Sequence, residues 1–234
     1  MSVKKVLITG ANKPRGIGVE TLRLFLKAGY EAVVVARDFS NFEFKDNPKV
    51  QIIKYDLTNI GGVSELVKQI GHVDVLVNNS GLNNFSHFSE YTEKQLTEIL
   101  NVNLLAPYEL IRAVIAQWKK EGSPFGRIVN VSSEAAANGN RDVWYGATKA
   151  ALSNLTKSFY ILERKNGLII NAVEPGVIDS NWYKDVEWRK EIVESAKNRN
   201  QVIQPEAVAE TIFWLGSTSP DGINGALIPV QAGK

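Results

Sequence analysis

A tyrosine, a lysine and a serine have the types and spacing that proton transfer to an oxygen atom needs. Tyr145 and Lys149 are four residues apart, so they share one face if their segment is helical. A phenol with a pKa of about 10 transfers protons poorly at neutral pH, but a nearby ammonium favours its phenolate form. Lys149 is therefore expected to lower the pKa of Tyr145. As a carbonyl accepts a hydride, Tyr145 can donate a proton to its oxygen while Ser133 donates a hydrogen bond to the same atom.

The spacing alone does not single out Tyr145, because Tyr108 and Tyr160 also precede a cation by four residues. The surroundings of Tyr145 are what distinguish it. Ser133 comes twelve positions earlier, directly after an apolar run at residues 127–132. Open α/β sheets bind ligands at the carboxyl ends of their strands, where such a hydroxyl could meet the tyrosine. We therefore expect these side chains at the mouth of a sheet.

Short apolar runs recur along the chain, each of the length of a strand buried on both faces. They lie at residues 6–10, 32–36, 50–55, 73–79, 127–132, 168–173 and 226–230. Segments with helical spacing of apolar residues separate most of them, at residues 16–28, 62–70, 92–120, 143–165 and 205–215. This alternation predicts one α/β domain over residues 1–234, a Rossmann-type, doubly wound parallel sheet of about seven strands flanked by helices. Asn and Pro breakers at residues 38–49 predict a shortened crossover after the second strand.

A glycine-rich loop follows the first expected strand and leads into an amphipathic helix. Gly10, Gly16 and Gly18 would let backbone amides approach a pyrophosphate at the N-terminus of this helix. Glycine turns are common in α/β proteins, so the loop alone is weak evidence for a dinucleotide site.

Cations near this loop bear on the choice of cofactor. The second expected strand ends at Arg37, where an NAD-selective site would usually have an acidic residue. A guanidinium at this place could pair with a 2′-phosphate. With Lys13 and Arg15 in the glycine loop, this pattern favours NADP(H) over NAD(H), unless the three are ordinary solvated charges.

Along essentially its whole length the sequence resembles the short-chain dehydrogenase/reductase family, most of all its 3-oxoacyl-carrier-protein reductase and carbonyl reductase-like members. The glycine loop resembles the family's TGxxxGxG motif. The other family motifs follow in order at Asp56-Leu57, Asn78-Asn79-Ser80-Gly81, Asn103, Ser133, Tyr145, Lys149 and Pro175-Gly176-Val177-Ile178. Asn103 matches the helix asparagine that holds a water in a proton relay to the catalytic lysine. Several motifs in the family's order are far more specific than one.

The resemblance implies an NADP-dependent oxidoreductase that interconverts a carbonyl and a secondary alcohol, with the nicotinamide supplying the hydride. Tyr145 would act as general acid and base, Lys149 would lower its pKa and position the cofactor, and Ser133 would orient the substrate oxygen. The residues expected to bind the cofactor are Gly10, Asn12, Lys13, Arg15, Gly16, Ile17, Gly18, Arg37, Asp56, Leu57, Asn79, Gly81, Tyr145, Lys149, Pro175, Gly176 and Ile178. Plainer roles also fit Asp56, as a helix cap, and Asn79 and Asn103, as partners of buried backbone groups.

The glycine loop departs from the family pattern. Five residues separate Gly10 from Gly16, which amounts to a two-residue insertion, and Pro14 stiffens it. The insertion would either aim Lys13 or Arg15 at a 2′-phosphate or move Gly10 away from the cofactor.

Polar and aromatic residues near these motifs are candidates for the substrate pocket. They are Asn83, Asn84, Glu134, Asn138, Trp144, Trp182, Tyr183 and Trp188. Glu134, next to the serine of the catalytic set, suggests a substrate with a polar or cationic group. The last three aromatics either cover the substrate, as the family's equivalent loop does, or pack along a helix edge. The sequence does not identify the substrate.

Composition argues against several other classes of function. With 27 Lys and Arg against 25 Asp and Glu, the net charge of +2 is too small for the basic surface of a nucleic-acid-binding protein. The chain has no cysteine and only two histidines, so we expect no metal site. We expect no membrane span and a cytoplasmic location, because no apolar stretch approaches ~18 residues and no cleavage site follows the first run. Relatives pair helices like those at 92–120 and 143–165, which implies a homodimer or homotetramer.

Three other classes of function would leave different marks on the sequence. A non-catalytic NADP-binding regulator or sensor would use the same fold, since a fold does not guarantee chemistry, but a broken catalytic set would mark it. A serine hydrolase would need a G-x-S-x-G elbow and a late histidine, and a P-loop nucleotidase would need Gly-Lys-Ser/Thr after its glycines. The sequence has none of these features, and its catalytic set is intact.

Overall fold

A parallel sheet in the order β3-β2-β1-β4-β5-β6-β9 forms the centre of the protein. The computed structural model describes residues 3–182 and 187–232, apart from the side chains of residues 188 and 189. The strands are β1 Lys5–Thr9, β2 Glu31–Ala36, β3 Val50–Lys54, β4 Val75–Asn78, β5 Arg127–Val131, β6 Ile169–Pro175 and β9 Leu227–Val230. The order runs one way from β1 to β3 and the other way from β4 to β9, which confirms the predicted doubly wound sheet.

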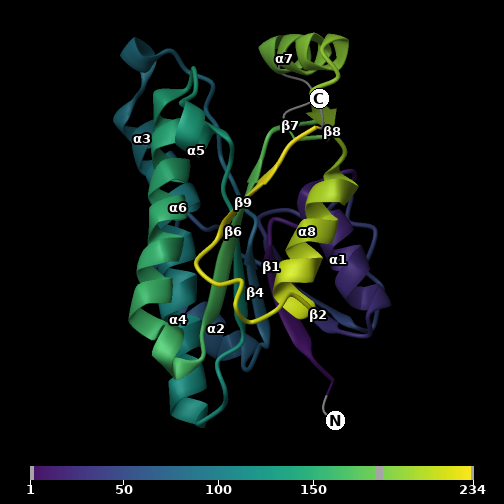
Figure 1. The fold of residues 1–234 in the computed structure, drawn as a ribbon, viewed down its shortest axis with the longest axis vertical. Helices are drawn as coiled ribbons and strands as arrows, with labels where there is room; N and C mark the ends of the chain where they lie inside the picture. Colours follow the sequence, from purple (N-terminus) through teal and green to yellow (C-terminus); the bar gives the residue numbers. More distant parts are fainter. Residues whose placement is uncertain (1–2, 183–186, 233–234) are drawn as a thin grey trace.

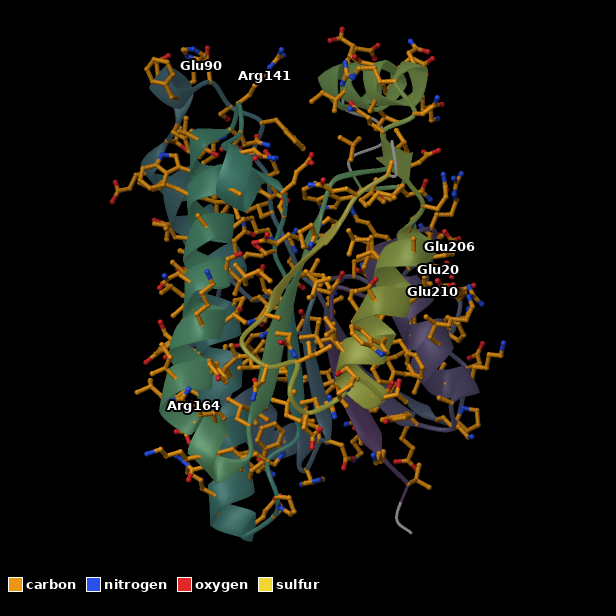
Figure 2. The ribbon with its side chains drawn as sticks, in the orientation of Figure 1. Glu20, Glu90, Arg141, Arg164, Glu206 and Glu210 are labelled. Atoms are coloured by element: carbon orange, nitrogen blue, oxygen red, sulfur yellow. The ribbon has the colours of Figure 1, made fainter. Side chains whose placement is uncertain are left out.

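Helices cover both faces of this sheet (Figure 1). Helices α1 Ile17–Lys27 and α8 Pro205–Ser217 lie on one face, and α2 Val63–Ile70, α4 Ala106–Glu121 and α6 Val143–Glu163 lie on the other. Successive strand residues point to opposite faces, and both sets are buried: Leu7 packs with α2 and α4, whereas Val6 and Ile8 pack with α1 and α8. This burial on both faces explains why the strands are continuous apolar runs. Charged side chains such as Glu210 of α8 and Arg164 after α6 are exposed on the outside (Figure 2).

The helix predicted at residues 92–120 contains one π-helical turn. Thr92 and Gln95 form a capping box that starts α3 Glu93–Leu100. The π segment η3 Asn101–Leu105 then connects α3 to α4, and Asn103 lies inside it. Apolar residues keep a helical spacing on both sides of the turn, so periodicity does not reveal it. Turns of this kind are frequent at functional sites.

The crossover between β2 and β3 contains turns and no helix over residues 38–49, which confirms the predicted shortening. Several further elements were not predicted. They are α5 Ala135–Asn138, β7 Val177–Ile178, β8 Val202–Ile203, α7 Glu187–Asn198, η1 Ile60–Gly62, η2 Phe88–Glu90 and η4 Arg164–Asn166. Strands β7 and β8 pair apart from the main sheet, and together with α7 they stand at the end of the molecule to which β6 leads (Figure 1).

The helical stretch Glu93–Glu121 is long and apolar enough to cross a membrane by length and composition, and its most apolar 18-residue window has a mean hydropathy of 1.4. This finding differs from the expectation that no apolar stretch reaches such a length. Half of its most apolar window is buried inside the fold, where Leu110, Ile111 and Val114 belong to the core beneath the sheet. Packing on the sheet accounts for the apolar character of this helix.

Candidate active site

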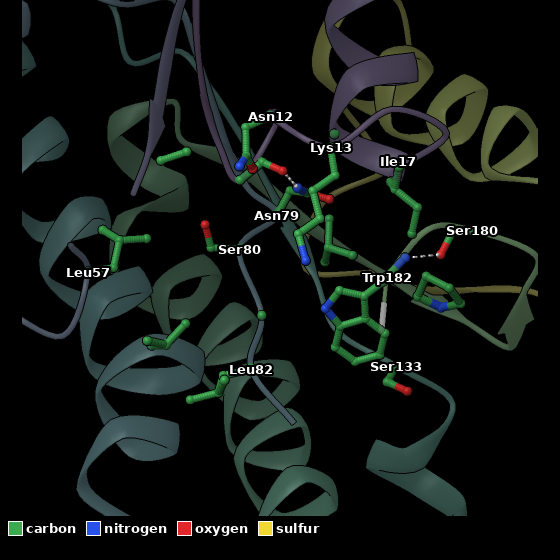
Figure 3. A pocket seen from close by; sticks show the side chains of 18 of the residues that line it. Asn12, Lys13, Ile17, Leu57, Asn79, Ser80, Leu82, Ser133, Ser180 and Trp182 are labelled. Carbon is green, nitrogen blue, oxygen red and sulfur yellow. Dashed lines mark hydrogen bonds between the residues drawn. The ribbon is translucent and has the colours of Figure 1, made fainter. Parts of the chain in front are cut away.

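One cavity with a volume of about 330 Å³ lies where the strands of the main sheet end (Figure 3). Its walls come from the segments that follow β1, β2, β3, β4 and β5 and from the end of β6. The predicted site residues that line it are Gly10, Asn12, Lys13, Gly16, Ile17, Gly18, Arg37, Asp56, Leu57, Asn79, Gly81, Ser133, Tyr145, Lys149, Pro175, Gly176, Ile178 and Trp182. The fold thus gathers residues from across the sequence near the point where the strand order reverses, between β1 and β4.

The glycine loop passes too close to its neighbours to carry side chains. Gly10 has a left-handed φ of 71°. A Cβ atom on Gly18 would lie 2.5 Å from Nδ2 of Asn79 and 2.8 Å from Cα of Ala11. Asn79 in turn holds the loop, because its Nδ2 donates a hydrogen bond to the carbonyl oxygen of Thr9 at 2.9 Å.

Helix α1 starts at the wall of the same cavity. Its N-cap residue, Gly16, offers no side-chain acceptor to the amides of the first turn, which leaves them available to an anion. Gly16 and Ile17 both line the cavity. A backbone cradle without side chains beside a helix N-terminus fits the pyrophosphate of a dinucleotide.

The three cations that favoured NADP(H) differ in their positions relative to the cavity. Arg37 is exposed, lines the cavity and has no hydrogen bond or ion pair with the described residues. Lys13 also lines the cavity. Arg15, which was also expected to bind the cofactor, does not line the cavity. Its guanidinium lies 3.9 Å from the carboxylate of Asp179, which Lys197 contacts at 3.2 Å. Arg15 lies within the insertion, where its backbone has a left-handed φ of 53°.

Ser133, Tyr145 and Lys149 line the same cavity, Ser133 from the segment after β5 and the other two from α6. All three are buried, with Lys149 only 3% exposed. The Lys149 ammonium donates a hydrogen bond to the carbonyl oxygen of Val131 at 2.8 Å, and its Nζ lies 5.8 Å from the centre of the Tyr145 ring. Burial lowers the pKa of Lys149 to about 8. The group is therefore still mostly protonated at pH 7 and places a cation beside the phenol.

Asp142, which the sequence analysis missed, fixes the start of the helix that carries Tyr145. It is 2% exposed and caps α6 by accepting a hydrogen bond from the Tyr145 amide at 3.1 Å. The same carboxylate accepts from the Tyr91 hydroxyl at 2.5 Å and from the Phe85 amide at 3.0 Å. Burial, together with the hydrogen bond to Asp142, raises the pKa of Tyr91. An Asp directly before a helical segment was the available signal.

A second set of hydrogen bonds holds the backbone at Lys149. The Ser132 hydroxyl donates to the Lys149 carbonyl oxygen at 2.9 Å and lies 2.8 Å from the Ser153 hydroxyl. Ser153 contacts the buried carboxylate of Glu174 at 2.7 Å. These contacts connect α6 to the ends of β5 and β6 and so fix the position of the helix relative to the sheet.

Asn103 is fully buried behind the cavity wall rather than in it. Its Oδ1 accepts a hydrogen bond from the Leu82 amide at 2.7 Å, and its Nδ2 donates to the Leu82 carbonyl at 2.8 Å and to the Thr148 hydroxyl at 3.1 Å. A Cβ atom on Gly81 would lie 3.5 Å from Nζ of Lys149 and 4.0 Å from Oδ1 of Asn103. Nζ of Lys149 and Oδ1 of Asn103 therefore both lie against the same side of Gly81.

The candidate substrate residues fall into three groups. Trp182 lines the cavity, and its ring centre lies 5.9 Å from that of Tyr145. The rest that the structure describes do not line it: Asn83, Asn84, Glu134, Asn138 and Trp144. Asn83 and Asn84 bind backbone groups instead: Asn83 accepts a hydrogen bond from the Phe85 amide, and Asn84 donates one to the Gln95 carbonyl oxygen. Tyr183 and the side chain of Trp188 lie outside the described residues.

Further lining residues were not among the predicted contacts. They are Ala36, Asp38, Tyr55, Ser80, Leu82, Val102, Val131, Ser132 and Ser180. Most of them neighbour a predicted residue in the sequence, so the position after each strand was the signal that could have found them. Among residues 3–182 and 187–232 there is no group of three or more His, Cys, Asp or Glu that could hold a metal ion.

Comparisons with known proteins agree with this arrangement. The family model described as short chain dehydrogenase matches residues 4–190. L-xylulose reductase of Mus musculus is 30% identical over 239 residues, and the alignment covers 98% of this chain and 96% of that protein.

Two solved structures share the fold over nearly the whole chain. 4-Hydroxyisoleucine dehydrogenase complexed with NADH has a TM-score of 0.88 at 25% identity, with 98% of each chain covered. ElxO with NADP bound has a TM-score of 0.82 at 26% identity, with 98% of this chain and 97% of that chain covered. The sheet order, the glycine cradle and these matches together show that the chain belongs to the short-chain dehydrogenase family.

Proposed function

We propose that the protein is an NADP(H)-dependent oxidoreductase that interconverts a carbonyl and a secondary alcohol. The observation that carries the proposal is one cavity lined both by the glycine loop at the start of α1 and by Ser133, Tyr145 and Lys149. When bound, the nicotinamide cofactor would supply or accept the hydride. Gly10, Gly16 and the first turn of α1 would hold its pyrophosphate.

Tyr145 acts as the general acid in reduction and as the general base in oxidation. Its hydroxyl donates a proton to the substrate oxygen as negative charge develops there, and Ser133 donates a hydrogen bond to the same oxygen. Lys149 favours the phenolate by its positive charge, which its pKa of about 8 preserves at neutral pH. Proton exchange with solvent would then pass near Asn103, because its Oδ1 and Nζ of Lys149 both lie close to Gly81.

The preference for NADP(H) rests on Arg37. Its guanidinium is exposed at the cavity after β2 and has no partner among the described residues, so it can pair with a 2′-phosphate. Asp38 also lines the cavity, but the amide and hydroxyl of Ser40 donate to its carboxylate at 3.0 and 2.8 Å. That carboxylate is therefore less available to the ribose hydroxyls that an NAD-selective acid would bind.

Assembly into a homodimer or homotetramer is part of the same proposal. Helices α4 and α6 expose large apolar side chains, Tyr108 on the first and Ile161 and Leu162 on the second. Burying such residues between subunits would remove this apolar surface from water. Sedimentation of the purified protein at several concentrations tests this part; a monomer throughout would refute it.

Cofactor-resolved turnover tests the proposed function. NADPH and NADH oxidation are followed at 340 nm with a panel of ketones, β-ketoacyl thioesters, quinones and sugar-like carbonyls. We expect turnover with at least one carbonyl and a higher kcat/KM for NADPH than for NADH. Equal use of NADH would overturn the role of Arg37, and tight NADPH binding without turnover of any carbonyl would favour a non-catalytic sensor.

A further inference from the structure

The carboxylate of Glu134 is half-buried and has neither a hydrogen bond nor an ion pair with the described residues. Its backbone, by contrast, is firmly held. The Glu134 amide donates to the carbonyl oxygen of Pro175 at 2.9 Å, and its own carbonyl oxygen accepts from the Asn138 amide at 3.1 Å. Glu134 is also the N-cap residue of α5, but its side chain makes no capping hydrogen bond. The side chain therefore has no evident role in stabilising the fold.

Glu134 lies beside the reacting end of the cavity. It directly follows Ser133, and its Oε2 would lie 3.2 Å from a Cβ atom on Gly176. Ser133, Gly176 and Trp182 all line the cavity, and Figure 3 labels Ser133 and Trp182 among its lining side chains. Glu134 does not line the cavity itself, but its carboxylate lies against Gly176, which lines the cavity together with the ring of Trp182 and the hydroxyl of Ser133. An aromatic ring, a hydroxyl and a nearby carboxylate are a mixture typical of pockets that orient a small polar ligand.

An unpartnered carboxylate in a half-buried place is unfavourable until a donor reaches it. Burial alone raises the pKa of Glu134, and no cation offsets this effect. A hydroxyl group of a substrate would supply the missing hydrogen bond, whereas a substrate carboxylate would meet a like charge. A cationic substrate would be attracted by Glu134 but repelled by Lys149 and Lys13, which already line the cavity.

We infer that Glu134 selects substrates in which hydroxyl groups flank the reacting carbonyl, and that it disfavours keto acids. This inference rests on the proposed function and names its substrate class as neutral, polyhydroxylated carbonyl compounds. Glu134 accepts a hydrogen bond from a substrate hydroxyl while Ser133 and Tyr145 bind the carbonyl oxygen. No proton or hydride moves through Glu134, so it orients the substrate and takes no part in the chemical step.

Four ketones with the same four-carbon chain test this selection. They are 2-butanone, 1,3,4-trihydroxy-2-butanone, acetoacetate and 4-trimethylammonio-2-butanone, which differ in hydroxyl content and charge. The kcat/KM of each is measured with NADPH for the unaltered protein and for Glu134→Gln, which keeps the size and an acceptor oxygen but removes the charge. Glu210→Gln, on the exposed face of α8, is the matched control (Figure 2).

We expect the trihydroxy ketone to be preferred over 2-butanone, and acetoacetate and the cationic ketone to be used less well than the trihydroxy ketone. In Glu134→Gln the ratio of kcat/KM for the trihydroxy ketone to that for acetoacetate should fall about tenfold or more, the difference between hydrogen bonds to charged and neutral acceptors. Glu210→Gln should leave that ratio within about twofold.

The two levels of the proposal fail in different ways. If 2-butanone is reduced but hydroxyl groups bring no advantage, or if Glu134→Gln keeps the original ratio, the role of Glu134 is refuted and the reductase function stands. A preference for the cationic ketone over the trihydroxy ketone refutes the substrate class in the same way. If none of the four ketones and none of the wider carbonyl panel is turned over, the proposed function fails, and the inference fails with it.

Discussion

Replacing Asp142 by alanine tests the idea that one buried carboxylate holds the tyrosine helix and the loop after β4 together. The Tyr145 amide would lose its cap, which costs about 1 kcal/mol. The Tyr91 hydroxyl would lose a hydrogen bond to a charged acceptor, about 1.5–3 kcal/mol. The Phe85 amide keeps Oδ1 of Asn83 at 2.9 Å and adds little. We therefore expect Asp142→Ala to lower the free energy of unfolding by about 2.5–4 kcal/mol.

Urea unfolding at one fixed protein concentration measures this change, because assembly would otherwise shift the apparent stability. With an m-value of about 3 kcal/mol per M, the midpoint should fall by about 1 M. Asp142→Asn keeps an acceptor oxygen and should lose only about 1–2 kcal/mol. A double-mutant cycle of Asp142→Ala with Tyr91→Phe should give a coupling energy of at least about 1 kcal/mol. A loss below about 1 kcal/mol for Asp142→Ala, or no coupling with Tyr91, would refute the reasoning.

Three further predictions follow from the site. The pKa of Lys149 is lowered by burial to about 8 in the folded protein, from its ordinary value of 10.5, so between these values the unfolded chain binds more protons. Relative to Lys149→Met, the unaltered protein should therefore gain stability as pH rises from 8 to 10.5, which urea midpoints along a pH series would show; a flat difference would contradict the burial of a charged lysine. Arg37→Ala should raise the KM for NADPH about tenfold and leave that for NADH nearly unchanged, as steady-state kinetics with both cofactors would test. Gly18→Ala would place a Cβ 2.5 Å from Nδ2 of Asn79 and 2.8 Å from Cα of Ala11, so fluorescence titration should show at least tenfold weaker NADPH binding. Unchanged affinity would contradict this prediction, because it would mean that the glycine loop can shift to accommodate the added methyl group.

The sheet and its main helices were predictable because they follow from hydrophobic periodicity. Strands with both faces buried appear as continuous apolar runs, and the helices that cover them repeat their apolar residues at helical spacing. The π turn at residues 101–105 was not predictable in this way, since the apolar spacing on either side of it is unchanged. The β7–β8 pair is two residues long on each strand and leaves no period to detect.

The cavity residues show the same difference between positions with a local sequence pattern and positions that depend on distant contacts. Gly10, Ser133 and Lys149 could be placed from the sequence, because each belongs to a local pattern of strand, loop and helix. Arg15 does not line the cavity, and its position could not be derived from the sequence, because the path of an inserted loop depends on a left-handed residue and on Asp179, a distant partner. Asp142 was missed for a related reason: its partners Phe85 and Tyr91 are 57 and 51 positions away in the sequence.

The most direct test of the proposed mechanism is to compare turnover and cofactor binding in Tyr145→Phe. This change removes one hydroxyl and leaves Ser133, Lys149 and the glycine cradle in place. The mechanism predicts that the Kd for NADPH stays within about threefold while kcat falls by about 10²- to 10⁴-fold, the contribution of a general acid or base. Turnover close to that of the unaltered protein would contradict it.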